Sequence, residues 1–226
     1  RSFSALKGIE DGVGRAVETS KPVHYGLGDV SSLSGTEAAG SVASLAFLGY
    51  TARLCARYGA RLIVRISPSA QLITKADATV TEAYMMEGKL DELDKSDTLR
   101  YHGTGDAYIT GGMRDMHYLG AACNVTVGSL SVETVWANAI VRRQGGIGIG
   151  GGTRWVLLFG LAMLADYALY GEELYAAAAK ISEDNVMISS IVGEDIMKFI
   201  IIGLLLVFTF TYLAGAGSVV RTIMKI

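Results

Sequence analysis

Glycines, acids, serines and histidines gather in this sequence directly after short β-rich runs, where a small molecule could be bound. The candidate ligand-binding residues are Gly26, Gly28, Asp29, Ser32, His102, Asp106, Gly128, Ser129, Glu133 and Glu173. In an open parallel sheet, ligands bind beyond the carboxyl ends of the strands. Glycine lets a ligand approach the backbone, and the N–H groups at a helix start attract an anion. The same glycines suit the tight strand-to-helix turns of any α/β protein, so a binding role and a purely steric role both stay open.

The loops that would form such a site are 26–34, 67–69, 102–106, 128–133, 150–154 and 171–173. An enzyme would take its acids from Glu37, Asp106, Glu133 and Glu173, with Ser129 and His102 beside them. Glu172 and Glu173 also have a simpler explanation, because carboxylates in a first turn stabilise a helix by about 0.3–1 kcal/mol. The acids alone therefore do not assign a catalytic base.

Two segments resemble the GxGxxG fingerprint of dinucleotide-binding proteins. Residues 26–31 read GLGDVS, with Ser31 at the third glycine position, and the acid expected about 20 residues further on is missing. Residues 146–151 read GIGIGG, but this stretch is so rich in glycine that a match is nearly automatic. The sequence has neither GxxxxGKS/T nor GxSxG, which argues against P-loop NTPases and α/β-hydrolases. No cofactor is predicted.

Two histidines have carboxylates close behind them in the sequence. His24 precedes Asp29, and His102 precedes Asp106, a combination of residue types that can bind zinc. Nothing in their spacing shows that the four side chains converge. We therefore predict no metal site and favour ordinary hydrogen-bonded histidines.

Charge and cysteine content narrow the class of protein. The formal net charge of −2 at pH 7 gives no basic surface for nucleic acid, so none is predicted as a partner. Cys55 and Cys123 belong to no CxxC pair and are expected to be buried thiols, because a free cysteine behaves as a small hydrophobic residue. Nothing here requires an oxidising compartment.

The elements that position these loops alternate between strands and helices along the chain. Strands are predicted at 22–25, 61–67, 98–102, 124–127, 147–149, 167–170 and 186–192. Helices are predicted from 34 to 59, from after Pro68 to 87, and at 106–122, 133–144, 153–165 and 172–181. Ser34 and Glu37 have the spacing of a capping box, and Gly59 and Gly88 mark helix ends. This alternation predicts a three-layer α/β fold with a mostly parallel, Rossmann-like sheet of six or seven strands.

The sequence near the C-terminus predicts a membrane span. Residues 199–220, FIIIGLLLVFTFTYLAGAGSVV, contain no charged side chain. An apolar run of about 18 or more residues can cross a bilayer as a helix. The predicted organisation is a soluble domain at 1–193 and a membrane anchor at 194–226, with one transmembrane helix at about 199–220. Its membrane-spanning residues would include Phe199, Leu205, Phe208, Tyr212 and Val220.

The clues to membrane orientation conflict. Arg221 and Lys225 favour a cytoplasmic C-terminus, while Lys198 lies on the other side of the apolar run. The chain begins at Arg1 rather than at a methionine, which leaves room for a leader or a first transmembrane helix before it. The two unpaired thiols favour a cytosolic domain, and we prefer the cytoplasmic side for the soluble body.

Several segments together resemble one family. They are 8–25 (GIEDGVGRAVETSKPVHY), 82–84 (EAY), 87–89 (EGK) and 166–179 (DYALYGEELYAAAA), followed by a last predicted strand and the apolar run. Over nearly the whole chain the sequence is similar to an uncharacterised family of membrane-anchored α/β proteins of bacteria and archaea, known only as a domain of unknown function. The resemblance implies a further hydrophobic segment before the soluble domain in some members. It transfers no reaction and no functional residues.

Two functional hypotheses follow. The first is a membrane-anchored, non-catalytic scaffold or accessory subunit that self-assembles or joins a larger membrane complex, with the lipid bilayer as a partner. The second is a small-ligand sensor or enzyme that uses the loops at the strand ends. A large assembly without ligand supports the first, and acids and histidines that converge in one pocket support the second.

Overall fold

Six parallel strands form the centre of the protein. The computed structural model describes residues 3–66 and 69–214, and the chain divides into two compact units between residues 182 and 183. In the first unit the strands lie in the order β3-β2-β1-β4-β5-β6, and every neighbouring pair is parallel. The strands are β1 (Val23–Gly26), β2 (Leu62–Arg65), β3 (Leu99–Arg100), β4 (Cys123–Gly128), β5 (Ile147–Gly152) and β6 (Tyr167–Tyr170). The predicted α/β class with a Rossmann-like parallel sheet is confirmed.

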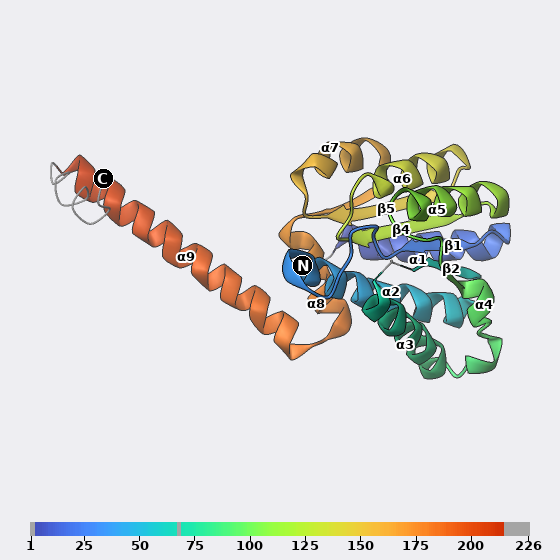
Figure 1. The fold of residues 1–226 in the computed structure, drawn as a ribbon. Coiled ribbons are helices and arrows are strands. Elements are labelled where there is room, and N and C mark those ends of the chain that lie inside the picture. The colour runs from blue at the N-terminus through green and yellow to red at the C-terminus, as the bar shows by residue number, and fades with distance from the viewer. Residues whose placement is uncertain (1–2, 67–68, 215–226) are drawn as a thin grey trace. The chain divides into compact units, whose positions relative to one another are not determined.

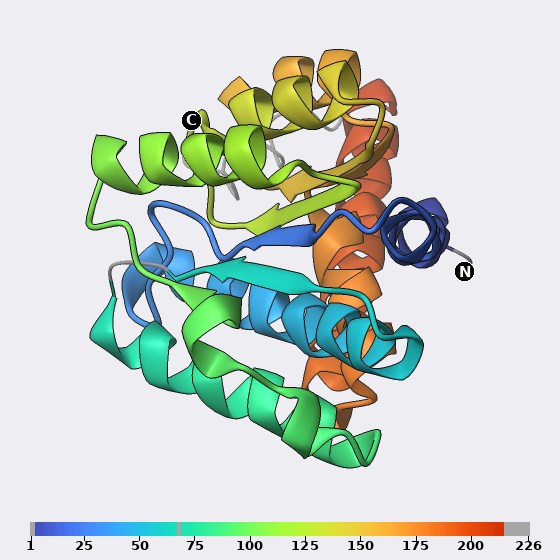
Figure 2. The same ribbon diagram turned by 90° about the vertical axis from the view of Figure 1, so that its right-hand side faces the viewer.

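Helices cover both faces of this sheet, which gives three layers (Figures 1 and 2). One face carries α1 (Ser4–Thr19), α2 (Ala38–Tyr58), α3 (Ala70–Met86) and α8 (Glu172–Ser182). The other carries α5 (Asp106–Leu119), α6 (Glu133–Arg143) and α7 (Trp155–Leu164). The short helix α4 (Lys95–Thr98) and the 3-10 turns η1 (Gly35–Glu37) and η2 (Leu90–Glu92) lie in the connections. Parallel strands require such crossovers, and the crossovers bury the sheet on both sides.

The strand order reverses between β1 and β4. From β1 the chain moves outward through β2 to β3, and it then returns to place β4 on the other side of β1. The loops that follow β1 and β4 therefore meet at the carboxyl edge of the sheet. This is the topological switch point at which open α/β sheets bind ligands.

The face of the sheet that lies under α5 and α6 is unusually polar. Side chains alternate along a strand, so His24 and Asn124, which are paired in register, point to the same face. One row further along, Gly26 stands between Arg65 of β2 and Thr126 of β4. The opposite face is apolar, because the intervening residues of these strands are buried hydrophobic residues.

The predicted strand at 186–192 is wrong, because these residues belong to a helix. Helix α9 begins at Asn185, where the Asp184 carboxylate accepts a 2.8 Å hydrogen bond from the Val186 backbone N–H. The β-branched residues of this stretch suggested a strand, but a strand must pair with a neighbour whereas a helix satisfies its backbone internally. The two compact units meet at 182/183. The predicted organisation into a soluble domain at 1–193 and an anchor at 194–226 stays a prediction.

The sequence pattern does not predict helix α1. Its three glycines disfavour a helix by about 1 kcal/mol each. Two of them face the sheet, where a Cβ at position 8 would lie 2.5 Å from the Tyr167 ring and one at position 12 would lie 2.4 Å from the Cys123 sulfur.

The predicted capping box is also wrong, because the Ser34 side chain makes no cap bond and its hydroxyl instead lies 3.0 Å from that of Ser32.

The second unit is dominated by one apolar helix, α9 (Asn185–Leu213), which is 29 residues long. It is long and apolar enough to cross a membrane, and none of its most apolar 18-residue window is buried. It contains Phe199, Leu205, Phe208 and Tyr212, whereas Val220 lies outside the described residues.

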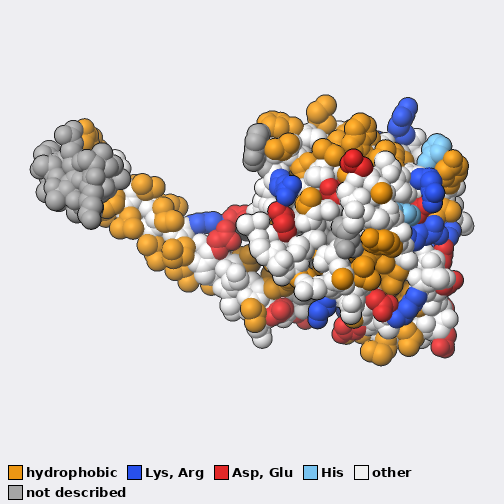
Figure 3. Space-filling model, viewed as in Figure 1, with side chains coloured by type: hydrophobic (Ala, Val, Ile, Leu, Met, Phe, Trp, Pro, Cys, Tyr) orange, Lys and Arg blue, Asp and Glu red, His pale blue; other side chains and the backbone are white. Residues whose placement is uncertain are grey.

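Large apolar side chains are also exposed on the first unit, over α6 and α7. Val132 and Trp136 are about half exposed, at 50% and 53%. On α7, Val156, Phe159 and Met163 are exposed at 60%, 75% and 73%. We call these five residues the α6–α7 surface. In Figure 3 hydrophobic side chains gather along this upper edge of the body, where Figure 1 places the two helices.

Two neighbouring glycines of α1 allow a matched test of its packing. Gly12→Ala should lower the free energy of unfolding by roughly 1–3 kcal/mol, because the new methyl overlaps both Cβ and Sγ of Cys123. Gly14→Ala should raise it by about 0.4–1 kcal/mol, because no atom lies within 4 Å and alanine restricts the unfolded chain. Urea unfolding of the full chain in detergent measures both. Equal effects of the two substitutions would contradict the packing described for α1.

Candidate functional site

A buried pair of opposite charges lies at the switch point. Arg65, the last residue of β2, and Glu133, the first residue of α6, are 0% and 1% exposed. Arg65 Nη2 lies 3.1 Å from Glu133 Oε1. Both side chains lie over Gly26, where a Cβ would be 2.5 Å from Arg65 Nη2 and 2.6 Å from Glu133 Oε1. The glycine at the end of β1 therefore makes the room in which the two charges meet.

Helix α5 covers the Arg65 guanidinium. The ring centroid of Tyr108 lies 6.0 Å from Arg65 Cζ, and the Tyr108 hydroxyl donates a 3.4 Å hydrogen bond to the Arg65 carbonyl. A Cβ at Gly112 would lie 2.2 Å from Arg65 Cδ, so a glycine is needed here for the helix to approach. Within the described residues, Arg65 Nε and Nη1 are buried without a hydrogen-bond partner, and Glu133 Oε1 has the ion pair with Arg65 Nη2 but no contact with hydrogen-bond geometry.

A chain of amide and hydroxyl groups continues from Arg65 beneath α6. Arg65 Nη2 lies 3.4 Å from Asn124 Oδ1 and 3.5 Å from Thr126 Oγ1. Asn124 Nδ2 donates to Thr126 Oγ1 at 2.7 Å and to Asn138 Oδ1 at 3.1 Å. Asn138 in turn donates to Thr134 Oγ1 at 3.4 Å. Such a buried network holds its members in one arrangement, because any unpaired member is costly.

The loops after β1 and β4 are bonded directly to each other. The Asp29 backbone N–H donates to Glu133 Oε2 at 3.0 Å. The Asp29 carboxylate accepts a 2.8 Å bond from the Ser131 N–H and a second bond from the Ser131 hydroxyl. Ser129 donates through its hydroxyl to the Glu37 carbonyl at 3.0 Å. The Asp29 carboxylate thus occupies the position just before α6 at which an anionic ligand could bind.

Burial sets the protonation of the groups in this layer. It raises the pKa of Glu133 from 4.5 to about 7, and the attraction of Arg65 offsets this only in part. Burial also lowers the pKa of His24 to about 4, so this imidazole is neutral, and its Nε2 lies 2.9 Å from the Gly120 carbonyl oxygen. A glutamate that titrates near neutrality beside a guanidinium can take up or release one proton, or can stabilise a bound anion when protonated.

Six of the ten predicted site residues lie in the adjoining loops after β1 and β4, at the switch point. They are Gly26, Gly28, Asp29, Gly128, Ser129 and Glu133. Gly28 and Gly128 have positive φ angles of 97° and 122°, and a Cβ at either would collide with the facing loop or with α2. Ser32 lies further along the β1 loop, where its N–H donates to the Ser41 hydroxyl at 2.9 Å.

The other three predicted residues lie elsewhere. His102 Nε2 lies 3.0 Å from Asp115 Oδ2, and Arg100 Nη1 lies 3.3 Å from the same oxygen. Asp106 is exposed at the first residue of α5, and Glu173 is exposed in the first turn of α8. Within the described part of the chain, no group of three or more His, Cys, Asp or Glu residues could hold a metal ion. Ser67 and Pro68 of the predicted loop at 67–69 lie outside the described residues.

Sequence reasoning missed Arg65, Tyr108, Asn124, Thr126 and Asn138. The available signal is a polar residue at alternate positions of an otherwise apolar strand, as in Asn124-Val125-Thr126. Glu133 was included as an acid at a helix start. Its partner could not be read from the sequence, because pairing with Arg65 depends on the order of the strands.

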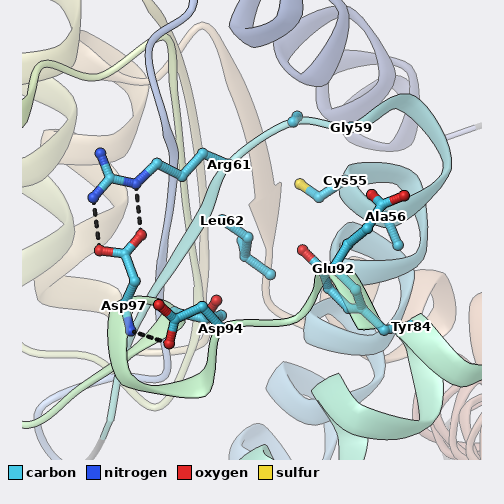
Figure 4. Close-up of a pocket in the computed structure, with 11 residues that line it drawn as sticks. Cys55, Ala56, Gly59, Arg61, Leu62, Tyr84, Glu92, Asp94 and Asp97 are labelled. Atoms are coloured by element: carbon cyan, nitrogen blue, oxygen red, sulfur yellow. Dashed lines mark hydrogen bonds and ion pairs between the residues drawn. The ribbon is translucent and has the colours of Figure 1, made fainter. Parts of the chain in front are cut away.

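The described part of the protein has two hollows on its surface that lie away from the switch point. The first, of about 220 Å³, is lined by residues at the start of β2, by Cys55 and Tyr84, and by the 92–98 segment (Figure 4). There Arg61 forms two hydrogen bonds of 2.7 and 2.6 Å with the Asp97 carboxylate, which lowers the pKa of Asp97 to about 2. The second, of about 470 Å³, is a groove lined by α1 and by the end of α2. Neither hollow contains the buried pair.

Comparison with known proteins places the chain in a family. A family model described as a domain of unknown function (DUF6754) matches residues 1–223, so the chain belongs to this uncharacterised family. No curated protein and no solved structure matches it.

The raised pKa of Glu133 predicts a specific pH dependence of stability. A carboxyl group whose pKa is higher in the folded state stabilises the fold below about pH 4.5, and this contribution is lost as the pH rises through about 7. The stability of the wild type relative to Glu133→Gln should therefore fall between pH 5 and pH 8, by on the order of 1–3 kcal/mol. Urea unfolding of both proteins across this range measures the difference.

Glu173→Gln is the matched control, because this glutamate is exposed on α8. Its stability should differ from that of the wild type by a constant amount between pH 5 and pH 8, because an exposed carboxylate is ionised throughout this range. A constant gap between the wild type and Glu133→Gln would show that Glu133 does not titrate in this range.

Proposed function

We propose that this protein is a membrane-anchored, non-catalytic scaffold or accessory subunit that assembles with copies of itself or joins a larger membrane complex. The observation that carries the proposal is α9, a 29-residue helix whose most apolar window is entirely unburied. An apolar helix of this length is stable in water only when covered, and a bilayer covers it without a protein partner.

The acids at the switch point also favour a structural role. Asp29 is bonded to Ser131, and Glu133 to Arg65 and to the Asp29 backbone, so their acceptor groups already join the two loops. The exposed apolar α6–α7 surface offers area for contacts of the body itself.

A second candidate function is a small-ligand sensor that uses the buried pair. It is favoured by Glu133, whose pKa of about 7 lies near physiological pH, and by the two Arg65 donors that lack a partner among the described residues. Opening of the Asp29–Ser131 contact would expose both groups to a carboxylate or phosphate ligand.

We assign the body to the cytoplasmic side of the membrane. Cys55 and Cys123 are free and buried, which suits a reducing compartment. Arg221 and Lys225, which lie outside the described residues, argue in the opposite direction if this is the only span.

Charged residues placed in α9 should release the protein from membranes. Each arginine at the centre of a span costs roughly 2.5–3.5 kcal/mol on the insertion scale, so Leu205→Arg combined with Phe208→Arg should reduce the membrane fraction at least tenfold. Carbonate-washed membranes from cells that express the full chain give the measurement. The control carries Val186→Arg and Val192→Arg, two exposed positions of the same helix that precede Glu194. If both double variants stay in the membrane fraction, α9 is not the anchor.

Native mass spectrometry of the full chain in mild detergent separates the two functions. A scaffold should appear as a defined multiple of the chain mass, and an accessory subunit as the chain mass plus that of a partner protein. Either mass should persist on dilution. A sensor should appear as a monomer with a small-molecule adduct, and that adduct should disappear in Glu133→Gln. A bare monomer at all concentrations would leave neither proposal standing.

A further inference from the structure

Helix α7 is apolar on both of its sides. Its ten residues, WVLLFGLAML, include no charged or polar side chain except the indole N–H of Trp155. Leu157 and Leu161 are buried and pack with Leu130 in one hydrophobic cluster. Val156, Phe159 and Met163 lie on the exposed side, at 60–75% exposure. A helix that is hydrophobic all round is normally buried, so the outer side of α7 has the composition of a covered surface.

Helix α6 extends this apolar area. A Cβ at Gly160 would lie 2.5 Å from Val135 Cγ2, so the glycine lets α7 pack closely against α6. Because the two helices pack this closely, we group the exposed Trp136 of α6 and its N-cap residue Val132 with the outer residues of α7 in the α6–α7 surface. Aromatic and aliphatic side chains of this kind are typical of helices that lie in the interfacial layer of a bilayer.

The exposed charges on and between these two helices are mostly positive. Between residues 132 and 164 the only carboxylate is Glu133, which is buried, whereas Arg142, Arg143 and Arg154 are exposed. Arg154 is paired with Glu37 at 2.9 Å and Asp166 is exposed just after α7, so Arg142 and Arg143 are the cations on which the argument rests. Arg142 Nη1 also donates to the Met163 carbonyl at 3.0 Å at the end of α7, which ties one cation directly to the apolar helix. An apolar centre bordered by arginines complements the headgroups and the acyl boundary of an anionic bilayer.

We infer that the α6–α7 surface docks onto an anionic lipid bilayer, the same membrane that α9 enters. The inference rests on the proposed membrane anchoring, because anchoring makes docking effective. Only Glu183 and Asp184 separate α8 from α9, so an inserted α9 keeps the body at a high local concentration beside lipid. The α6–α7 surface then needs only a low affinity for lipid, too low to bring an unanchored protein to the membrane, because the anchor and the surface act together.

Lipid contact can be measured directly on the full chain in vesicles. A fluorophore is attached at Phe159→Cys on α7, or at Met86→Cys on α3 as the matched control, because both positions are well exposed. The native Cys55 and Cys123 are fully buried, and burial raises the pKa of both thiols, so neither competes for the label. Each protein is reconstituted in phosphatidylcholine–phosphatidylglycerol vesicles that contain a spin-labelled quencher lipid, and in phosphatidylcholine vesicles with the same quencher.

The label at position 159 should be quenched several-fold more than the label at position 86, and more strongly with phosphatidylglycerol. Arg143→Glu should reduce this quenching several-fold without changing vesicle flotation, because it reverses one charge of the basic border. Equal, weak quenching at both positions in floating vesicles would overturn the docking inference and leave the anchor intact. Failure to float would overturn the anchor, and with it the basis of the inference.

A second outcome distinguishes lipid from protein. If the label at 159 is shielded from water but not quenched by lipid, and this shielding grows with the protein-to-lipid ratio, the α6–α7 surface binds a second copy of the chain. That result would also overturn lipid docking. The labelled variants should unfold at the same urea concentration as the wild type, since both substitutions are at exposed positions.

Discussion

The contact between Arg65 and Glu133 is the interaction on which the architecture of the body most depends. It joins the end of β2 to the start of α6 across the intervening β1, and it does so where neither charge can reach water. Removing two charges from water costs several kcal/mol per ion, and only close partners offset that cost. Gly26 and Gly112 supply the space, Tyr108 supplies a ring and a hydroxyl beside the guanidinium, and the Asp29 N–H supports the carboxylate. These contacts fix the positions of α5 and α6 along strands β1 and β2.

The two units differ in which kind of residue they bury. In the first unit most apolar residues are buried, and a layer of polar residues is buried with them between the sheet and α6. In the second, a long apolar helix has nothing in the described chain to cover it. The α6–α7 surface belongs to the first unit but resembles the second in composition, since it combines exposed Phe159 and Met163 with a border of arginines. This similarity in composition is the basis of our proposal that both contact the bilayer.

Much of the fold could be predicted because it follows from local patterns. The six strands β1 to β6 that alternate with helical runs, the glycine ends at Gly59 and Gly88, and the helix at 133–144 all follow from residues within one element. What failed depended on residues far apart in the chain. The glycines of α1 obscure a helix until Cys123 and Tyr167 are seen packed against them, and 186–192 has strand-like residues but no strand to pair with. For the same reason, Glu133 could be named from its position while Arg65, its partner, could not.

The glycines of β5 have one more effect. Gly148 and Gly150 present no side chain to α6, and a Cβ at either would strike the Asn138 amide at 2.7–2.9 Å. Over this strand α6 lies against bare backbone. Its Asn138 accepts a hydrogen bond from Asn124 of β4, while Ala137 and Val141 of the same helix pack in an apolar cluster with Met116 and Ala121. A shift of α6 by one residue would break the bond to Asn124, whereas an aliphatic contact would tolerate a smaller displacement. A homologue that exchanged Asn138 for leucine would therefore need to rebuild the strand beneath it.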